Sequence, residues 1–168
     1  MKPRVLVAGI GNIFFADDAF GPAVAQRLMH EMVDGAPAPD GVRIEDFGIR
    51  GMHLAYELLN GYAAAVIVDA VACGGAAGTL FVIEPKEPIH AGALDAHRMD
   101  IASVLGFLRL LGGVPPPLTI VGCEPESLEH GAPMSATVER AVEAALPVVR
   151  RVAAQLVAQS EEHVCTEA

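Results

Sequence analysis

Short, wholly apolar runs that end on a glycine or an acid are the feature that most constrains how this chain can fold. Residues 5–8 run into Gly9, and residues 64–68 run into Asp69. Such runs are typical of strands that are buried on both faces, as in a parallel sheet covered by helices. Segments with apolar residues at helical spacing lie between them. This alternation predicts an α/β fold, a three-layer sandwich with a mostly parallel central sheet of about five strands flanked by helices.

The positions of the expected elements follow from these patterns. We expect strands at residues 5–8, 42–47, 64–69, 79–84 and 118–122, and helices at residues 19–33, 52–59, 97–111 and 136–159. Stretches rich in Gly and Pro predict the loops between them. No repeat or change of composition marks a second domain. The sequence therefore predicts a single domain over residues 1–168, with residues 160–168 as a frayed polar tail.

Charge and cysteine content exclude several classes of function. The chain has 11 Lys and Arg against 21 Asp and Glu, a formal net charge of −10. Nucleic acids and anionic membrane surfaces are recognised by clustered cations, so neither is an expected partner. No apolar run is long enough for a membrane-spanning helix. Three widely spaced cysteines without a CxxC pair argue against a disulfide framework or a structural zinc site and favour a reducing, cytoplasmic setting.

The loop after the first strand is the first candidate for a ligand site, because α/β folds bind ligands outside the carboxyl ends of their strands. Gly9 and Gly11 follow the strand as in a dinucleotide-binding loop, but Phe14 stands where that motif has its third glycine. Asp17 and Asp18 precede the next helix and would repel a pyrophosphate there. Dinucleotide binding is therefore the weaker interpretation, and one of the two acids is expected to cap the helix.

Acids at two further strand ends and one histidine complete the candidates. Asp69 ends a buried strand, where a carboxylate is costly unless it is hydrogen-bonded, paired or bound to a cation. Asp46 ends the preceding strand in a similar way. His97 stands at the start of an expected helix, and His90 is its main rival. If Asp18, Asp69 and His97 meet above the strand ends, they form an open site for a borderline divalent cation such as nickel or zinc. The alternative for Asp69 is that the following Gly-rich turn donates backbone N–H groups to it.

Several segments together resemble one known family over nearly the whole chain. They are residues 9–12 with Asp17 and Asp18, residues 46–52, residues 66–71, His97 before a helix, and residues 118–126. In this combination the chain resembles the hydrogenase maturation endopeptidases. The resemblance implies a nickel-dependent peptidase that removes a short C-terminal extension from the large-subunit precursor of a [NiFe] hydrogenase after nickel insertion.

The resemblance also implies roles for individual residues. The catalytic residues and nickel contacts would be Asp18, Asp69 and His97, with Asp17, Asp46 and Asn12 in support. Nickel would arrive with the substrate rather than reside permanently on the protein.

The chain departs from the family pattern at several positions. Family members often have Glu where this chain has Asp18, whose side chain is one methylene shorter. The loop after Asp46 carries Phe47 and Arg50 in place of the small residues of some relatives. This second departure bears on which hydrogenase is served rather than on the chemistry.

The sequence leaves other functions open. A non-catalytic nickel-checkpoint chaperone would bind the same precursor without cutting it. A dinucleotide-binding α/β enzyme and a phosphorylase-like enzyme would need phosphate donors, against which the acidic first loop argues. Cys123 follows a strand and could be a nucleophile, but a buried core cysteine is the favoured interpretation.

Overall fold

A computed structural model describes residues 5–33, 40–86 and 101–166 and confirms the α/β class. Within these residues a five-stranded sheet has the order β2-β1-β3-β5-β4. Strands β1 (Val5–Ile10), β2 (Val42–Gly48), β3 (Ala64–Ala70) and β5 (Leu118–Cys123) are parallel, and β4 (Leu80–Ile83) runs antiparallel to β5.

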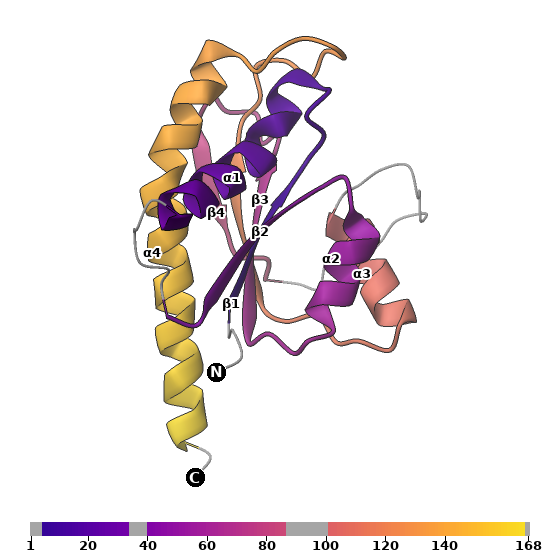
Figure 1. The fold of residues 1–168 in the computed structure, drawn as a ribbon, viewed down its shortest axis with the longest axis vertical. Coiled ribbons are helices and arrows are strands. Elements are labelled where there is room, and N and C mark those ends of the chain that lie inside the picture. The colour runs from indigo at the N-terminus through magenta and orange to yellow at the C-terminus, as the bar shows by residue number, and fades with distance from the viewer. Residues whose placement is uncertain (1–4, 34–39, 87–100, 167–168) are drawn as a thin grey trace.

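Helices cover both faces of this sheet and complete the expected three layers (Figure 1). Helices α1 (Phe20–Val33) and α4 (Ala136–Thr166) lie on one face, and α2 (Gly51–Leu58) and α3 (Ile101–Leu110) lie on the other. A short 3-10 helix, η1 (Ala16–Ala19), precedes α1. Among the described residues, no helix is both long and apolar enough to cross a membrane.

Side-chain alternation along β1 explains why its sequence is apolar throughout. Val5 and Val7 pack into the core beneath α1 and α4, whereas Leu6 and Ala8 pack into the core beneath α2 and α3. Every residue of β1 is buried. A strand in this position has no polar face, because both of its faces are covered by helices.

The boundaries differ from expectation at two helices. The helix expected at residues 19–33 is split, because η1 comes first and α1 begins at Phe20. The helix expected to end at Gln159 continues to Thr166, so residues 160–166 are helical rather than a frayed tail. Residues 160–166 have no apolar spacing that predicts a helix, because the core no longer lies beside them. These polar residues continue a helix that is stabilised by packing earlier in its length. Residues 97–100, the start of the third expected helix, lie outside the described residues.

The topology places one switch point in the sheet, at the carboxyl ends of β1 and β3. Strand β1 is flanked by β2 on one side and β3 on the other. The helix that follows β1 lies on one face of the sheet, and the helix that follows β2 lies on the opposite face. Where the connections that follow neighbouring strands run to opposite faces of the sheet, a crevice forms between them. Ligands of open α/β sheets bind in this crevice.

Candidate active site

Glycines at the switch point allow α1 to lie directly against the strands. A Cβ atom on Gly9 would lie 2.3 Å from the carbonyl oxygen of Gly21, and one on Gly21 would lie 2.2 Å from the carbonyl oxygens of both Ile10 and Val68. No side chain fits at such distances. Gly9, one of the two glycines that resemble a dinucleotide-binding loop, is thus explained by close packing between helix and sheet.

Asp17 is completely buried and holds the loop between β5 and α4. Its Oδ2 accepts the backbone N–H groups of Glu126 at 2.7 Å and Ser127 at 2.9 Å, and its Oδ1 accepts that of Ser135 at 2.7 Å. Burial by itself would raise the pKa of Asp17, but these backbone donors hold its pKa below the usual value. Asp17 therefore stays ionised and acts as a structural anchor.

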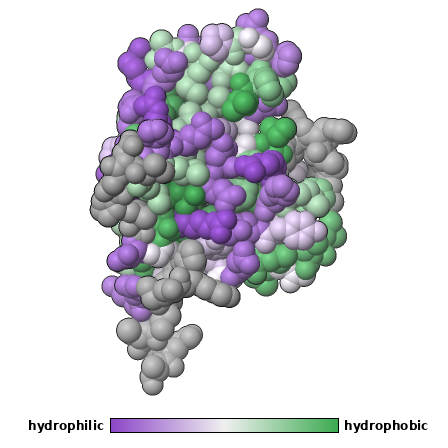
Figure 2. Space-filling view, in the orientation of Figure 1, coloured by the Kyte–Doolittle hydropathy of each residue, from purple (hydrophilic) through white to green (hydrophobic). Residues whose placement is uncertain are grey.

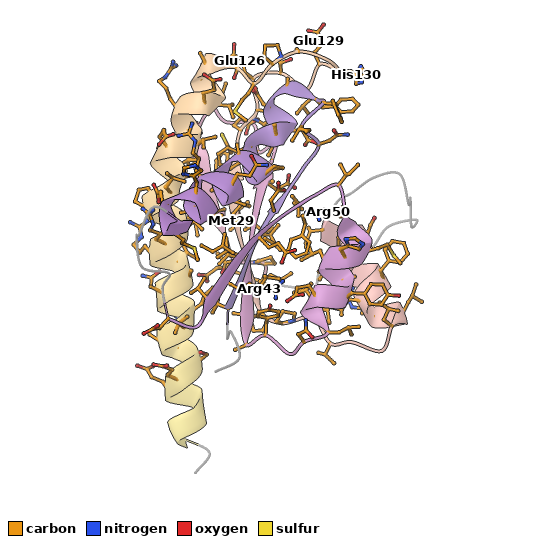
Figure 3. The ribbon with its side chains drawn as sticks, viewed as in Figure 1. Met29, Arg43, Arg50, Glu126, Glu129 and His130 are labelled. Atoms are coloured by element: carbon orange, nitrogen blue, oxygen red, sulfur yellow. The ribbon has the colours of Figure 1, made fainter. Side chains whose placement is uncertain are left out.

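The loops before η1 and before α4 are joined by further contacts. The Gly131 N–H donates to the Phe14 carbonyl at 2.8 Å, and the rings of Phe15 and His130 meet edge to face with centroids 5.0 Å apart. Figure 3 shows His130 on the β5–α4 loop together with Glu126 and Glu129. The two loops form one connected rim beside the switch point.

Asp18 lies beside this anchor in a different environment. The backbone N–H of Asn12 donates to its Oδ2 at 2.7 Å, and its Oδ1 accepts no hydrogen bond within the described residues. Burial raises the pKa of Asp18, and the Asn12 N–H offsets only part of that rise. A half-buried carboxylate with one unoccupied oxygen is suited to a cation. The Asn12 side chain shapes the same loop, because its Oδ1 accepts the N–H of Phe14 at 3.0 Å.

The prediction that Asp17 or Asp18 caps the first helix is wrong. Both acids lie within η1, and the residue before η1 makes no side-chain cap. Their carboxylates accept hydrogen bonds from Asn12 and from the β5–α4 loop instead. Ser135 is the residue that caps a helix here, because its Oγ accepts the N–H of Val138 in α4 at 3.2 Å.

Asp69 lies near the carboxyl end of β3, where the sequence placed it. It is partly buried and pairs in register with Gly122 of β5. Ala65 and Ile67 pack beneath α2 and α3, so alternation directs the Asp69 side chain to that same face. Helix η1, which carries Asp18, contacts β3. The structure therefore brings Asp18 and Asp69 onto neighbouring elements at the switch point.

The third expected ligand is a histidine, His97. His97 and its rival His90 both lie outside the described residues. Within the described residues, no three His, Cys, Asp or Glu side chains lie close enough to hold a metal ion. The choice of His97 stays a prediction.

Asp46 faces the other side of the sheet. Gln26 of α1 donates its Nε2–H to Asp46 Oδ2 at 2.8 Å, and Val42 and Ile44 of the same strand pack on the α1 side. Alternation places Asp46 on the face opposite Asp69, so β1 lies between them. Asp46 contributes to an open groove of about 630 Å³, lined by Gln26, Met29, His30, Arg43, Ile44, Glu45, Asp46 and Arg50.

Glu124 is a structural acid near the site that the sequence analysis did not single out. Its Oε2 accepts the backbone N–H groups of Cys73 at 2.8 Å and Gly75 at 3.1 Å. The donor at Cys73 is the main cause that lowers the pKa of Glu124. Glu124 thereby fixes the loop that follows Asp69. Glu124 directly follows a buried strand, and the same sequence pattern that identified Asp69 could have identified it.

Cys123 is a core residue, as expected. It is fully buried among the side chains beneath α1 and α4. Burial, with smaller effects from the charges of Asp17 and Glu124, raises the pKa of Cys123 to about 11. A thiol of this kind is not an activated nucleophile at neutral pH.

Known proteins with similar sequences are described as hydrogenase maturation or hydrogenase expression/formation proteins. The sequence pattern of a family described as hydrogenase maturation protease matches residues 23–152. The hydrogenase 2 maturation protease of Escherichia coli K12 is 35% identical over 149 residues, which cover 87% of this chain and 88% of that protein. A hydrogenase expression/formation protein, HupD of Rhizobium leguminosarum, is 34% identical over 89% of this chain and 74% of its own length.

Solved structures agree with these matches. The hydrogenase maturating endopeptidase HybD from E. coli superimposes with a TM-score of 0.69 at 35% identity, over 87% of this chain and 89% of that one. A hydrogenase 2 maturation peptidase from a Thaumarchaeota archaeon has a TM-score of 0.63 at 28% identity, over 89% and 97% of the two chains. Fold and sequence similarity thus point to the same group of proteins.

Proposed function

The chain belongs to the hydrogenase maturation protease family and is an endopeptidase of that family, and on this premise we propose that it removes a C-terminal extension from the nickel-loaded large-subunit precursor of a [NiFe] hydrogenase. The observation that carries the proposal is the pair of carboxylates at the switch point, Asp18 on η1 and Asp69 on β3. This is the position at which an open α/β sheet binds its ligand.

The residues present fit a borderline divalent cation. Asp18, Asp69 and His97 would hold nickel that arrives with the precursor, an arrangement of oxygen and nitrogen ligands that such ions accept. Bound there, the ion would supply a positive charge that polarises the scissile carbonyl or a water, or that holds the peptide in place. The raised pKa of Asp18 supports this, because burial disfavours its negative charge until a cation compensates it.

Each nearby residue has a separate task in this proposal. Asn12 orients the Asp18 carboxylate through its backbone N–H. Asp17 and Glu124 fix the loops on either side, the first at residues 126–135 and the second at residues 73–75. The buried thiol of Cys123 takes no part as a nucleophile, so water is the proposed attacking group. Catalysis would take place in the cytoplasm.

A non-catalytic nickel-checkpoint chaperone is the second candidate, and one experiment separates the two. The nickel-loaded precursor is incubated with wild-type protein and with Asp18→Ala and Asp69→Ala variants, and its intact mass is measured. We expect a loss of mass with the wild type only. Binding without any change of mass would favour the chaperone.

A further inference from the structure

The free edge of β2 lies in the groove described above. Within the described residues β2 pairs with β1 alone, and it forms one end of the sheet. Residues of the groove come from both faces of β2, Ile44 and Asp46 from one and Arg43 and Glu45 from the other, so the strand edge itself forms the floor. Met29 of α1 forms part of the wall. In the view of Figure 3, Met29, Arg43 and Arg50 surround this part of β2.

Backbone hydrogen-bonding groups point outward along this edge. The Gly41 carbonyl accepts the Val5 N–H of β1 at 3.0 Å, so the next peptide N–H, that of Val42, points away from β1. Groups alternate along a strand, so the N–H and C=O of Val42 and Ile44 point outward from the same edge; Ile44 lines the groove, and Val42 lies two residues before it on that edge. None of these groups has a hydrogen-bond partner within the described residues. At the carboxyl end of the edge, Arg50 donates to the Asp46 and Phe47 carbonyls.

The lining indicates what kind of molecule fits. Two cations, Arg43 and Arg50, are balanced by two acids, Glu45 and Asp46, so the groove has no net charge that selects an ion. In Figure 2 the middle of this face is mainly hydrophilic, with apolar residues among the polar ones. A cleft of about 630 Å³ between a strand edge and a helix is of ligand-binding size and suits an extended peptide, which supplies a complementary row of N–H and C=O groups.

The groove lies two strands away from the end of β3 that carries Asp69. Asp46 pairs in register with Gly9, and Gly9 pairs in register with Val68 of β3, one residue before Asp69. Neighbouring strands lie roughly 4.8 Å apart, so the groove ends about 10 Å from the end of β3. About three residues of extended chain span that distance.

We propose that the groove along β2 binds an extended segment of the hydrogenase large-subunit precursor by strand addition, beginning about three residues from the scissile bond. This inference rests on the proposed function and adds a binding mode to it. The edge groups of Val42 and Ile44 hold the backbone of the segment, and the wall at Met29 contacts its side chains.

Two matched pairs of variants test the proposal in kinetic assays of precursor cleavage. Val42 is the first residue of an edge strand and its N–H points outward, so Val42→Pro removes a donor without breaking the ladder with β1. We expect Val42→Pro to raise KM about fivefold over Val42→Ala, which keeps the donor, as the loss of one net hydrogen bond implies. Met29→Trp should raise KM by at least about tenfold by filling the groove, with kcat unchanged.

Leu110→Trp is the control for Met29→Trp, because Leu110 is 71% exposed on α3, away from the groove. If Met29→Trp lowers the melting temperature, Met29→Lys at the same exposed helix position replaces it. If the Val42→Pro and Met29 variants cleave the precursor with the KM of the wild type, the inference is overturned. A wild-type protein that leaves the precursor uncut would instead overturn the proposed function. A change of oligomeric state in these variants with unchanged KM would assign the edge to a second copy of this chain and likewise overturn the inference.

Discussion

Asp17 and Asp18 are neighbours in the chain, yet their carboxyl groups have opposite pKa shifts. Backbone donors from residues 126–135 outweigh burial at Asp17 and lower its pKa. At Asp18 burial outweighs the single donor from Asn12, and its pKa is raised. Hydrogen-bond donors of the protein therefore stabilise the negative charge of Asp17. The negative charge of Asp18 is stabilised only in part. Residue type alone could not distinguish them, because the distinguishing groups come from a loop more than one hundred residues away.

Removal of the Asp17 carboxylate should destabilise the fold. Asp17→Ala leaves three backbone donors without their acceptor, and we expect a loss of about 3 kcal/mol in the free energy of unfolding at pH 7. Denaturant titration measures this loss. The stabilisation by Asp17 is present above its unfolded pKa of about 3.9 and is lost as pH falls through its lower folded pKa. Asp40→Ala, at an exposed turn, should change stability by less than about 0.5 kcal/mol; an equal loss in both variants would refute the anchor role.

Neutralisation of Asp18 should have the opposite effect on stability. Its folded pKa lies above its unfolded pKa, so the fold favours the protonated form and stability falls as pH rises through the folded pKa. Asp18→Asn should raise the melting temperature at pH 7 and abolish precursor cleavage. The gain should vanish below about pH 3.9, where the carboxyl is protonated in both states. A lower melting temperature at pH 7 would contradict the assignment of Asp18 as a desolvated acid.

The environments of the two described cysteines predict different reactivity. Cys73 is exposed, whereas Cys123 is buried with a pKa of about 11. Iodoacetamide at pH 8 should alkylate Cys73 and leave Cys123 unmodified in the folded protein, as peptide mapping would reveal. Cys123→Ala should keep kcat for the precursor within a few-fold of wild type. A complete loss of cleavage in a folded Cys123→Ala protein would require a covalent mechanism.

At the scale of elements, the approach of α1 to the strand ends positions the site. Gly21→Ala would bring a Cβ atom against carbonyl oxygens of β1 and β3, and we expect a loss of about 3 kcal/mol, measured by denaturant titration. Gly61→Ala is the matched control. Gly61 has φ 78° but nothing within 4 Å of its Cβ position, so only the backbone term of about 1 kcal/mol applies. Equal losses of stability in Gly21→Ala and Gly61→Ala would show that α1 can move away from the sheet at no cost.

The elements themselves were predictable where apolar patterns exist. The strands at Val5–Ile10 and Ala64–Ala70 show as continuous apolar runs because both faces are buried. The end of α4 was not predictable in this way, since residues 160–166 continue the helix without a core beside them. The split between η1 and α1 depends on the hydrogen bonds of Asp17 and Asp18, which no local pattern records.

At the scale of the whole molecule, topology determines which strand ends share a site. The sequence placed Asp46 and Asp69 at strand ends and Asp18 in the loop after the first strand. The order β2-β1-β3 with side-chain alternation then separates Asp46 from Asp69. Alternation within one strand can be read from sequence, but strand order depends on contacts between distant segments. This is why two of the carboxylates lie at the switch point, while the third lines the groove on the opposite face.

We propose that Asp18 and Asp69 form a site that cuts only a nickel-loaded precursor. Intact-mass spectrometry of the precursor, with and without nickel, after incubation with wild type or Asp69→Ala tests it most directly. We expect loss of the C-terminal extension only when wild type meets the nickel-loaded precursor, and at least a hundredfold slower cleavage of that precursor by Asp69→Ala. Full cleavage by Asp69→Ala, or equal cleavage of the nickel-free precursor by wild type, would contradict it.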